Sequence, residues 1–191
     1  MSEVKSLTDA EIMLKITEYD SKALEQLYDR YTPILYTLIK RIIPEKETAE
    51  EVLSEVFVII WRQIDHFDFS TSNVYTWMVT LARNKAIDVK NRSIGKVTEE
   101  YTDDYEKEKI LPKLSPEIES VDLEEVLGMK EKIEGAMKSL TDAQRYVIEL
   151  SYFEGLDESG IAEKLKIPSS TVKSKLQVAI GNLMKKISKT N

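Results

Sequence analysis

The chain has 191 residues, 42% of them hydrophobic, and that share excludes a wholly disordered protein while fitting one large or two small domains. It contains no cysteine, which excludes disulfides and thiolate metal sites, and its few glycines and prolines favour helices over a many-stranded sheet. The formal net charge of −7 argues against a nucleic-acid partner only if the charge is spread evenly, which it is not. The sequence shows no signal-peptide pattern and no apolar run of the ~18 residues that span a membrane, so we expect a cytoplasmic protein without membrane insertion.

The first two predicted helices lie within residues 9–43. Thr8 and the acid three residues after it form a capping-box pattern that opens the first helix, and a break is expected near Asp20. The next helix is expected over residues 31–43, with Pro33 starting a turn and Pro44 ending it.

Two further helices complete the N-terminal half. Thr48 is the expected cap of the third, which is apolar around most of its circumference and should therefore lie centrally, with Phe57 and Trp61 in the core. Residues 65–72 are interpreted as a loop, and the fourth helix is expected over residues 73–91. Residues 83–96 carry five bases against one acid, which makes a first basic patch.

An acidic segment separates the two halves. Residues 97–125 hold eleven acids against three bases, a local net charge of −8, and show no sustained helical period. We interpret residues 97–120 as a flexible linker between an N-terminal domain, residues 1–96, and a C-terminal domain, residues 121–191. The fold class expected is all-α, with two small helical domains.

The C-terminal domain contains a helix-turn-helix pattern. Asp157 can cap a short helix over residues 158–165, Pro168 follows it, and Ser169 or Ser170 can cap the next helix. Apolar residues at helical spacing mark the inward face of each helix. Residues 160–191 carry seven lysines against one acid, which makes a second basic patch.

The outward face of the second of these helices is polar and cationic. Short hydroxyls, cations and amides suit base edges and phosphates in a major groove. The alternative is an ordinary helical hairpin with a solvated, lysine-rich face. The candidate DNA contacts are Ser169, Ser170, Thr171, Lys173, Ser174, Lys175 and Gln177.

Two blocks together resemble one known family. The string from Leu140 to Leu150, with the helix-turn-helix after it, resembles the −35-reading domain of sigma-70 transcription factors, closest to the extracytoplasmic-function group. The block Ala49 to Arg62, followed by Tyr75 to Asp88, is similar to that group's other domain. The resemblance covers nearly the whole chain.

The resemblance implies a non-enzymatic factor that needs no cofactor. Such a factor binds core RNA polymerase at its β′ clamp and β flap, directs it to promoter DNA and helps to melt the −10 element; an anti-sigma factor is a common further partner. The resemblance implies that Glu51, Glu55 and Arg62 contact the β′ clamp. Without the resemblance, these residues are better interpreted as a solvent-exposed face of the helix.

The resemblance also implies that residues 69–92 bind the DNA strand of the −10 element. An aromatic or amide-lined pocket offsets the cost of flipping out a base, and cations contact the backbone. Trp77 has the alternative of a core residue. The base-pocket candidates are Phe69, Asn73, Tyr75 and Trp77; the backbone candidates are Arg83, Asn84, Lys85, Lys90 and Arg92. The acidic segment could mimic nucleic acid along the RNA-exit path or act as a solubilising tether.

Three positions depart from the family pattern. Lys166 stands where relatives usually have glycine, and a positive φ there costs roughly 1 kcal/mol. Val178 and Ile180 stand where relatives tend to carry arginine, so −35 binding should be weaker or these residues should face a protein. Ile180 extends an apolar stripe, which favours its burial; Val178 fits neither role clearly.

Two rival functions remain open on the sequence alone. A stand-alone helix-turn-helix regulator leaves the N-terminal block unexplained, and a protein-interaction module that has lost DNA reading fits Val178 and Ile180. An enzyme is disfavoured because His66 is the only histidine and no carboxylate pair, phosphate-binding glycine loop or metal site stands out.

Overall fold

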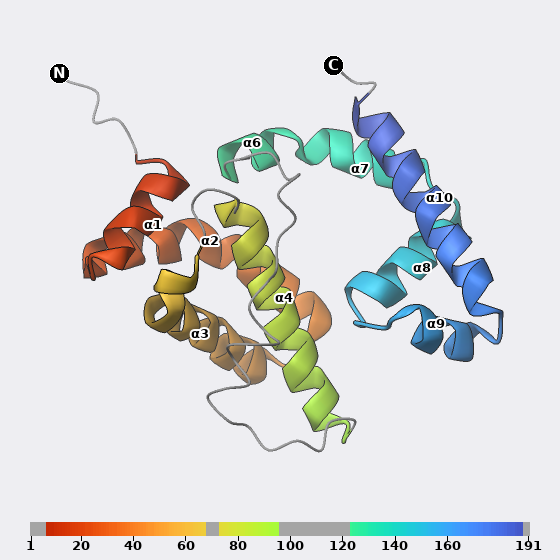
Figure 1. The fold of residues 1–191 in the computed structure, drawn as a ribbon, viewed down its shortest axis with the longest axis horizontal. Helices are drawn as coiled ribbons and strands as arrows, with labels where there is room; N and C mark the ends of the chain where they lie inside the picture. The colour runs from red at the N-terminus through yellow and green to blue at the C-terminus, as the bar shows by residue number, and fades with distance from the viewer. Residues whose placement is uncertain (1–6, 68–72, 96–122, 189–191) are drawn as a thin grey trace. The chain divides into compact units, whose positions relative to one another are not determined.

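The structure is a computed structural model that describes residues 7–67, 73–95 and 123–188, and within these ranges it is helical with no strand (Figure 1). The chain divides into two compact units, Met1–Leu123 and Glu124–Asn191. The predicted all-α class is therefore confirmed. The predicted linker, residues 97–120, lies outside the described residues, as does Phe69.

The first unit packs its helices around one long central helix. These are α1 (Asp9–Thr17), α2 (Ser21–Ile42), α3 (Lys46–Gln63), the short 3-10 turn η1 (Ile64–His66) and α4 (Val74–Ser93). Helix α2 lies against α1, α3 and α4, and α3 also packs on α4 (Figure 1). The largest fully buried side chains come from all of these elements: Ile12, Met13, Ile16, Leu27, Tyr31, Leu35, Ile39, Ile42, Ile60, Ile64, Met78 and Leu81.

Local hydrogen bonds explain where α1 and α2 begin. Thr8 Oγ1 accepts from the Glu11 N–H at 3.2 Å and the Glu11 carboxylate accepts from the Thr8 N–H at 2.8 Å, so the predicted capping box is confirmed. Asp20 caps α2 by accepting from the Lys22 N–H at 2.9 Å, which places the predicted break correctly.

The prediction of a separate helix over residues 31–43 is wrong at its start, because α2 runs unbroken from Ser21 to Ile42 with Pro33 inside it. A proline inside a helix removes one hydrogen bond and crowds the carbonyl four residues back. Leu27, Tyr31, Leu35 and Ile39 are all fully buried, at a spacing of four residues on both sides of the proline. The burial of this continuous stripe outweighs the local cost.

Helix α3 also begins earlier than expected. It starts at Lys46 after Glu45, so Thr48 lies inside the first turn and is not the cap. Phe57 is buried as predicted, whereas Trp61 is only half-buried and meets the ring of Tyr19 edge-on at 5.6 Å. The predicted loop at residues 65–72 starts with the turn η1 instead, and residues 68–72 lie outside the described residues.

A buried carboxylate ties the first unit together. Asp9 is 2% exposed; its Oδ1 accepts from Arg30 Nη1 at 2.5 Å, and its Oδ2 accepts from the Tyr31 hydroxyl at 2.7 Å. The same Oδ2 accepts from the backbone N–H of Leu123, the last residue of this unit, at 3.1 Å. A charge buried this deeply is stable only when it is paired and hydrogen-bonded, as it is here.

The second unit surrounds α10. After α6 (Leu123–Gly128), which begins at the last residue of the first unit, come α7 (Lys130–Lys138), α8 (Asp142–Tyr152), α9 (Glu158–Leu165) and α10 (Ser169–Ser188). Helix α10 packs against α7, α8 and α9. The core of the second unit consists of Leu150, Ile161 and Val172, with Leu156, Ala162, Leu165, Ile167 and Leu176 packed around them. Among the described residues, none of the helices combines the length and apolar character needed to cross a membrane.

Candidate functional site

The turn between α9 and α10 has the geometry of a helix-turn-helix. Asp157 caps α9, as predicted, by accepting from the Gly160 N–H at 2.7 Å. Lys166 ends α9 with φ 54° and ψ 45°, a left-handed conformation in which a glycine would be unstrained. Pro168 then precedes α10, which begins at Ser169.

The expected serine cap of α10 is wrong. Ser169 and Ser170 are already helical, and the N–H groups of Thr171 and Val172 donate to the Pro168 carbonyl at 2.9 and 3.2 Å. A proline can stand directly before a helix because its missing N–H would have no partner there. Both serine side chains are consequently exposed at the positive end of the helix.

Gly160 has a packing reason that its sequence context did not reveal. A Cβ at this position would come within 3.3 Å of Asp157 Oδ1 and of Leu156 Cδ2. The capping carboxylate and the turn before α9 therefore approach the helix closely. Gly181 in α10 differs, because a Cβ there would meet no atom within 4 Å.

The predicted DNA-contact residues lie on α10 outside the side that packs into the core. Val172 and Ala179 are fully buried on the opposite side and fix the rotation of the helix about its axis. Thr171 is half-buried. The exposed members of the predicted set are Ser169, Ser170, Lys173, Ser174, Lys175 and Gln177.

Two apolar residues on α10 stay in contact with solvent. Val178 is 51% exposed and Ile180 is 50% exposed. The expected burial of Ile180 is therefore wrong: it follows buried Ala179 by one residue, and a step of about 100° around a helix carries it away from the core. Met184, one turn further along the same side, is 64% exposed.

One lysine of the second basic patch is committed to a local partner. Lys164 Nζ donates to Glu154 Oε2 at 2.5 Å, which joins α9 to the end of α8. This hydrogen bond, helped by the charge of Glu154, raises the pKa of Lys164. Lys164 therefore stays charged but is neutralised locally, unlike the cations on the outward face of α10.

In the first unit, three of the predicted −10 residues are buried. Asn73 is 3% exposed and caps α4 by accepting from the Thr76 N–H at 3.0 Å. Trp77 is 2% exposed and its ring meets Phe67 edge-on at 5.4 Å, which is the core role left open as its alternative. These contacts place both side chains inside the first unit rather than presenting either of them to a ligand.

Lys85 is the third buried member. It is 2% exposed, and its Nζ lies 2.9 Å from Glu55 Oε2 on α3. A buried cation needs such a partner, so this pair fixes α4 against α3. Lys85 was expected to contact DNA and Glu55 to contact polymerase. Because the two residues lie on different helices, residue spacing along one helix could not have predicted that they pair.

The remaining predicted residues of α4 are half-buried: Tyr75, Arg83, Asn84, Lys90 and Arg92. Arg92 Nη2 lies 2.9 Å from Asp88 Oδ2, an ion pair along the helix. Arg83 Nη1 donates to Asn84 Oδ1 at 3.3 Å.

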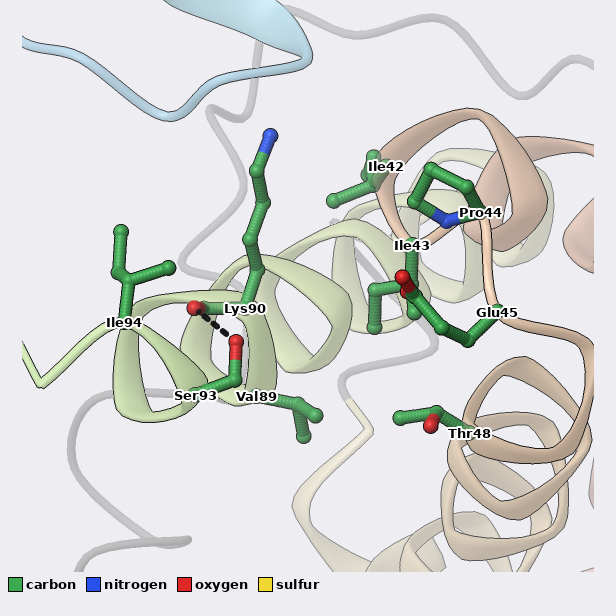
Figure 2. A pocket seen from close by; sticks show the side chains of 9 residues that line it. All are labelled: Ile42, Ile43, Pro44, Glu45, Thr48, Val89, Lys90, Ser93 and Ile94. Carbon is green, nitrogen blue, oxygen red and sulfur yellow. Dashed lines mark hydrogen bonds between the residues drawn. The ribbon is translucent and has the colours of Figure 1, made fainter.

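A groove lies beside the C-terminal end of α4 (Figure 2). Its volume is about 360 Å³, and the backbone carbonyl of Lys90 accepts from the Ser93 hydroxyl at 2.7 Å at its edge. In Figure 2 the Lys90 side chain extends outward between Ile94 and the end of α2. The lining residues are Ile42, Ile43, Pro44, Glu45, Thr48, Val89, Lys90, Ser93 and Ile94. Within the described ranges no cluster of histidines and carboxylates suits a metal ion.

Helix α3 presents an acidic stripe to solvent. Glu51, Glu55 and Arg62 are exposed and recur on one side of the helix. Glu47, Glu50, Glu51, Ser54 and Glu55 line a shallow hollow of about 520 Å³. Val58, 46% exposed, lies on the same side between Glu55 and Arg62, and sequence analysis missed it. Its helical spacing from Glu51 and Glu55 was the available signal.

Two family models match the chain, each over one unit. The model of Sigma-70 region 2 matches residues 27–93, and that of Sigma-70, region 4 matches residues 130–182. Together they span more than half of the chain. The first match covers most of the helices around α2, and the second covers α7 to most of α10.

Relatives matched over about nine tenths of this chain show the same similarity. The ECF RNA polymerase sigma factor SigK of Mycobacterium sp. strain KMS is 29% identical over 178 residues, covering 92% of this chain and 89% of the relative. SigK of Mycobacterium tuberculosis strain H37Ra is 26% identical over 174 residues, covering 90% and 89%.

Among solved structures, Rhodobacter sphaeroides SigE in complex with the anti-sigma ChrR matches with 23% identity and a TM-score of 0.46, covering 93% of this chain and 97% of that one. CnrH in complex with the cytosolic domain of CnrY matches with 16% identity and a TM-score of 0.42, covering 96% and 99%.

Proposed function

Since the chain belongs to the extracytoplasmic-function group of the sigma-70 family, we propose that it binds core RNA polymerase and reads the −10 and −35 elements of promoters. The family acts with RNA polymerase in promoter-specific initiation of transcription. The observation that carries the proposal is that both sigma-70 regions occur in one chain, each on a unit with a solvent-exposed face of suitable charge.

The −35 element is assigned to α10. Its first turns carry exposed hydroxyls, lysines and an amide, while Val172 and Ala179 hold the opposite side in the core. A helix whose N-terminal half enters the major groove reads base edges with such groups and neutralises phosphates with its lysines. Lys173 and Lys175 contact the phosphate backbone of the DNA, and Ser174 and Gln177 contact base edges.

The −10 element is assigned to α4 and the segment before it. Arg83, Asn84, Lys90 and Arg92 contact the strand backbone, and Tyr75 stacks with a base together with Phe69. Asn73 and Trp77 are both buried, so they position the start of α4 and do not contact DNA. Lys85 acts as a positioning residue through Glu55 and does not contact DNA.

The acidic stripe of α3 is proposed to bind core polymerase. Glu51 and Arg62 are the charged contacts with the β′ clamp, and Val58 is an apolar contact between them. Glu55 has a double role, because it also neutralises buried Lys85. The second unit is expected to engage the β flap, as in the family. The acidic segment at residues 97–125 either follows the RNA-exit path or serves as a tether.

Charge reversal on α3 tests the polymerase contact. Glu51→Lys should lower the affinity for core polymerase at least about tenfold, because like charges across an interface cost several kcal/mol. Glu25→Lys is the matched control, since Glu25 is also exposed but lies on α2. Affinity is measured by titrating fluorescently labelled chain with purified core polymerase.

A competition assay on the same complex tests DNA reading. Holoenzyme bound to a selected promoter duplex should resist displacement by non-promoter duplex of equal length. A chain that fails to bind core polymerase at all is instead a stand-alone regulator. A chain that binds polymerase but shows no preference between the duplexes is an interaction module, and both outcomes contradict the proposal.

A further inference from the structure

Val178 is an apolar side chain on the surface of α10 that is assigned to DNA. It lies seven residues after Thr171 and four after Ser174, so the three recur on one side of the helix. Lys175 and Lys185 lie three residues before it and seven after it. Val178 is 51% exposed, and the buried residues Val172 and Ala179 point to the other side.

Its place along α10 lies within reach of the groove. Val178 is the tenth residue of a helix that begins at Ser169, which puts it about 14 Å from the start at a rise of ~1.5 Å per residue. The major groove, about 12 Å wide, admits an α-helix, and a helix that lies along it can meet base edges over its first ten residues. Ile180, exposed to the same extent, lies about 200° around the helix from Val178, so the two side chains face different directions.

The chemistry of valine restricts what it can face. It neither donates nor accepts a hydrogen bond, and a polar base edge pressed against it would lose water without compensation. The major groove offers one apolar group, the C5-methyl of thymine. The lysines on either side hold the phosphates of the same duplex, which keeps the helix in the groove.

We propose that Val178 is a specificity-determining residue that reads the C5-methyl group of one thymine in the −35 element. The inference rests on the proposed function, because it requires α10 to lie in the major groove. It gives Val178 a role in DNA reading where the sequence left that residue without one.

Removing single methyl groups from the DNA tests the proposed contact of Val178 directly. The probe is the duplex that reconstituted holoenzyme selects from a pool randomised across the −35 region. Each thymine is replaced in turn by deoxyuridine, which removes only the methyl group. Replacing one particular thymine should lower affinity about fourfold, the effect of withdrawing one methyl group from apolar contact. The other replacements should have no effect.

Protein variants assign that methyl to Val178. In Val178→Ala holoenzyme the same deoxyuridine replacement should no longer change affinity, because the contact is already lost. Ile180→Ala is the matched control and should keep the fourfold sensitivity. Alanine is a better helix former than valine or isoleucine, so both variants preserve α10. Val178→Ile should also retain the sensitivity.

The outcomes separate this inference from the proposed function. If a scrambled −35 region competes as well as the selected one, −35 reading itself fails and the inference with it. If the selected region is preferred but no deoxyuridine lowers affinity, or the loss persists undiminished in Val178→Ala, only the role of Val178 is overturned. A selected −35 region without thymine overturns it equally.

Discussion

Lys166 holds a left-handed backbone at the turn that joins α9 to α10, with φ 54°. A side chain with a Cβ is strained there, whereas glycine is not. We therefore expect Lys166→Gly to stabilise the turn by about 0.5 kcal/mol, because relief of a strain of roughly 1–2 kcal/mol exceeds the entropy cost of glycine, roughly 0.5–1 kcal/mol. The measurement is hydrogen exchange, followed by mass spectrometry of peptides from α9 and the first half of α10.

The control for this prediction separates charge from strain. Lys166→Gln removes the cation but keeps the Cβ, so its exchange rates should match those of the wild type. Equal protection in the glycine and glutamine variants would show that the left-handed conformation carries no strain in this turn.

Asp9 tests how far a single buried charge holds the first unit together. Asp9→Asn leaves Arg30 and the Tyr31 hydroxyl with a neutral partner, and should destabilise this unit by about 3 kcal/mol. Both tryptophans, Trp61 and Trp77, lie in the first unit, so their fluorescence in urea reports on it selectively. The exposed Glu25→Gln should leave the midpoint unchanged, and an equal shift in both variants would rule out a special role for Asp9.

Residues paired across helices were the part of the site that the sequence could not predict. The acidic stripe of α3 and the outward face of α10 follow from helical periodicity, because their members lie three or four residues apart. The pairing of Lys85 with Glu55 depends on how α3 packs against α4, which no local pattern encodes. The same packing buries Trp77, for which the sequence offered both a core and a surface role.

At the scale of the element, two glycines inside helices should respond differently to the same change. Gly181→Ala should stabilise α10 by about 1 kcal/mol, because alanine is the better helix former and nothing lies within 4 Å of the new Cβ. Gly160→Ala should gain none of this, because its Cβ would crowd the Asp157 cap and Leu156 at 3.3 Å.

Hydrogen exchange of α9 and α10 peptides measures both effects in one experiment. An equal gain for the two variants would mean that the Asp157 side chain moves aside freely, and that the close approach at Gly160 has no structural importance. The comparison needs no estimate of absolute stability, because each glycine serves as the reference for the other.

Helix starts were predictable where a side chain supplies the cap. Thr8 and Asp157 were predicted as caps and Asp20 as a break, and each accepts from a backbone N–H two or three residues ahead. The errors at Tyr31 and Thr48 differ in kind: tertiary burial overrides the local signal of Pro33 in α2, whereas α3 begins among exposed residues before Thr48. Helix α2 continues through its proline to bury one long stripe, and α3 begins at Lys46 without any side-chain cap.

At the scale of the whole molecule, the local charge of each surface matters more than the net charge of the chain. A net charge of −7 coexists with the exposed lysines of α10, because eleven acids fall within residues 97–125 and others line α3. Electrostatic attraction to DNA depends on the field near each surface over about one Debye length, roughly 10 Å at 0.1 M salt. An acidic chain can therefore present a basic face to a phosphate backbone.

The most direct test of the central claim is run-off transcription with purified core polymerase and mapped start sites. We expect the chain to give transcripts from a defined set of start sites, each preceded by shared −10 and −35 sequences at a constant separation. Core polymerase alone should give none of these transcripts. Transcription from the same positions with and without the chain, or no transcription at all from a holoenzyme shown to have assembled, would contradict its assignment as a promoter-reading sigma factor.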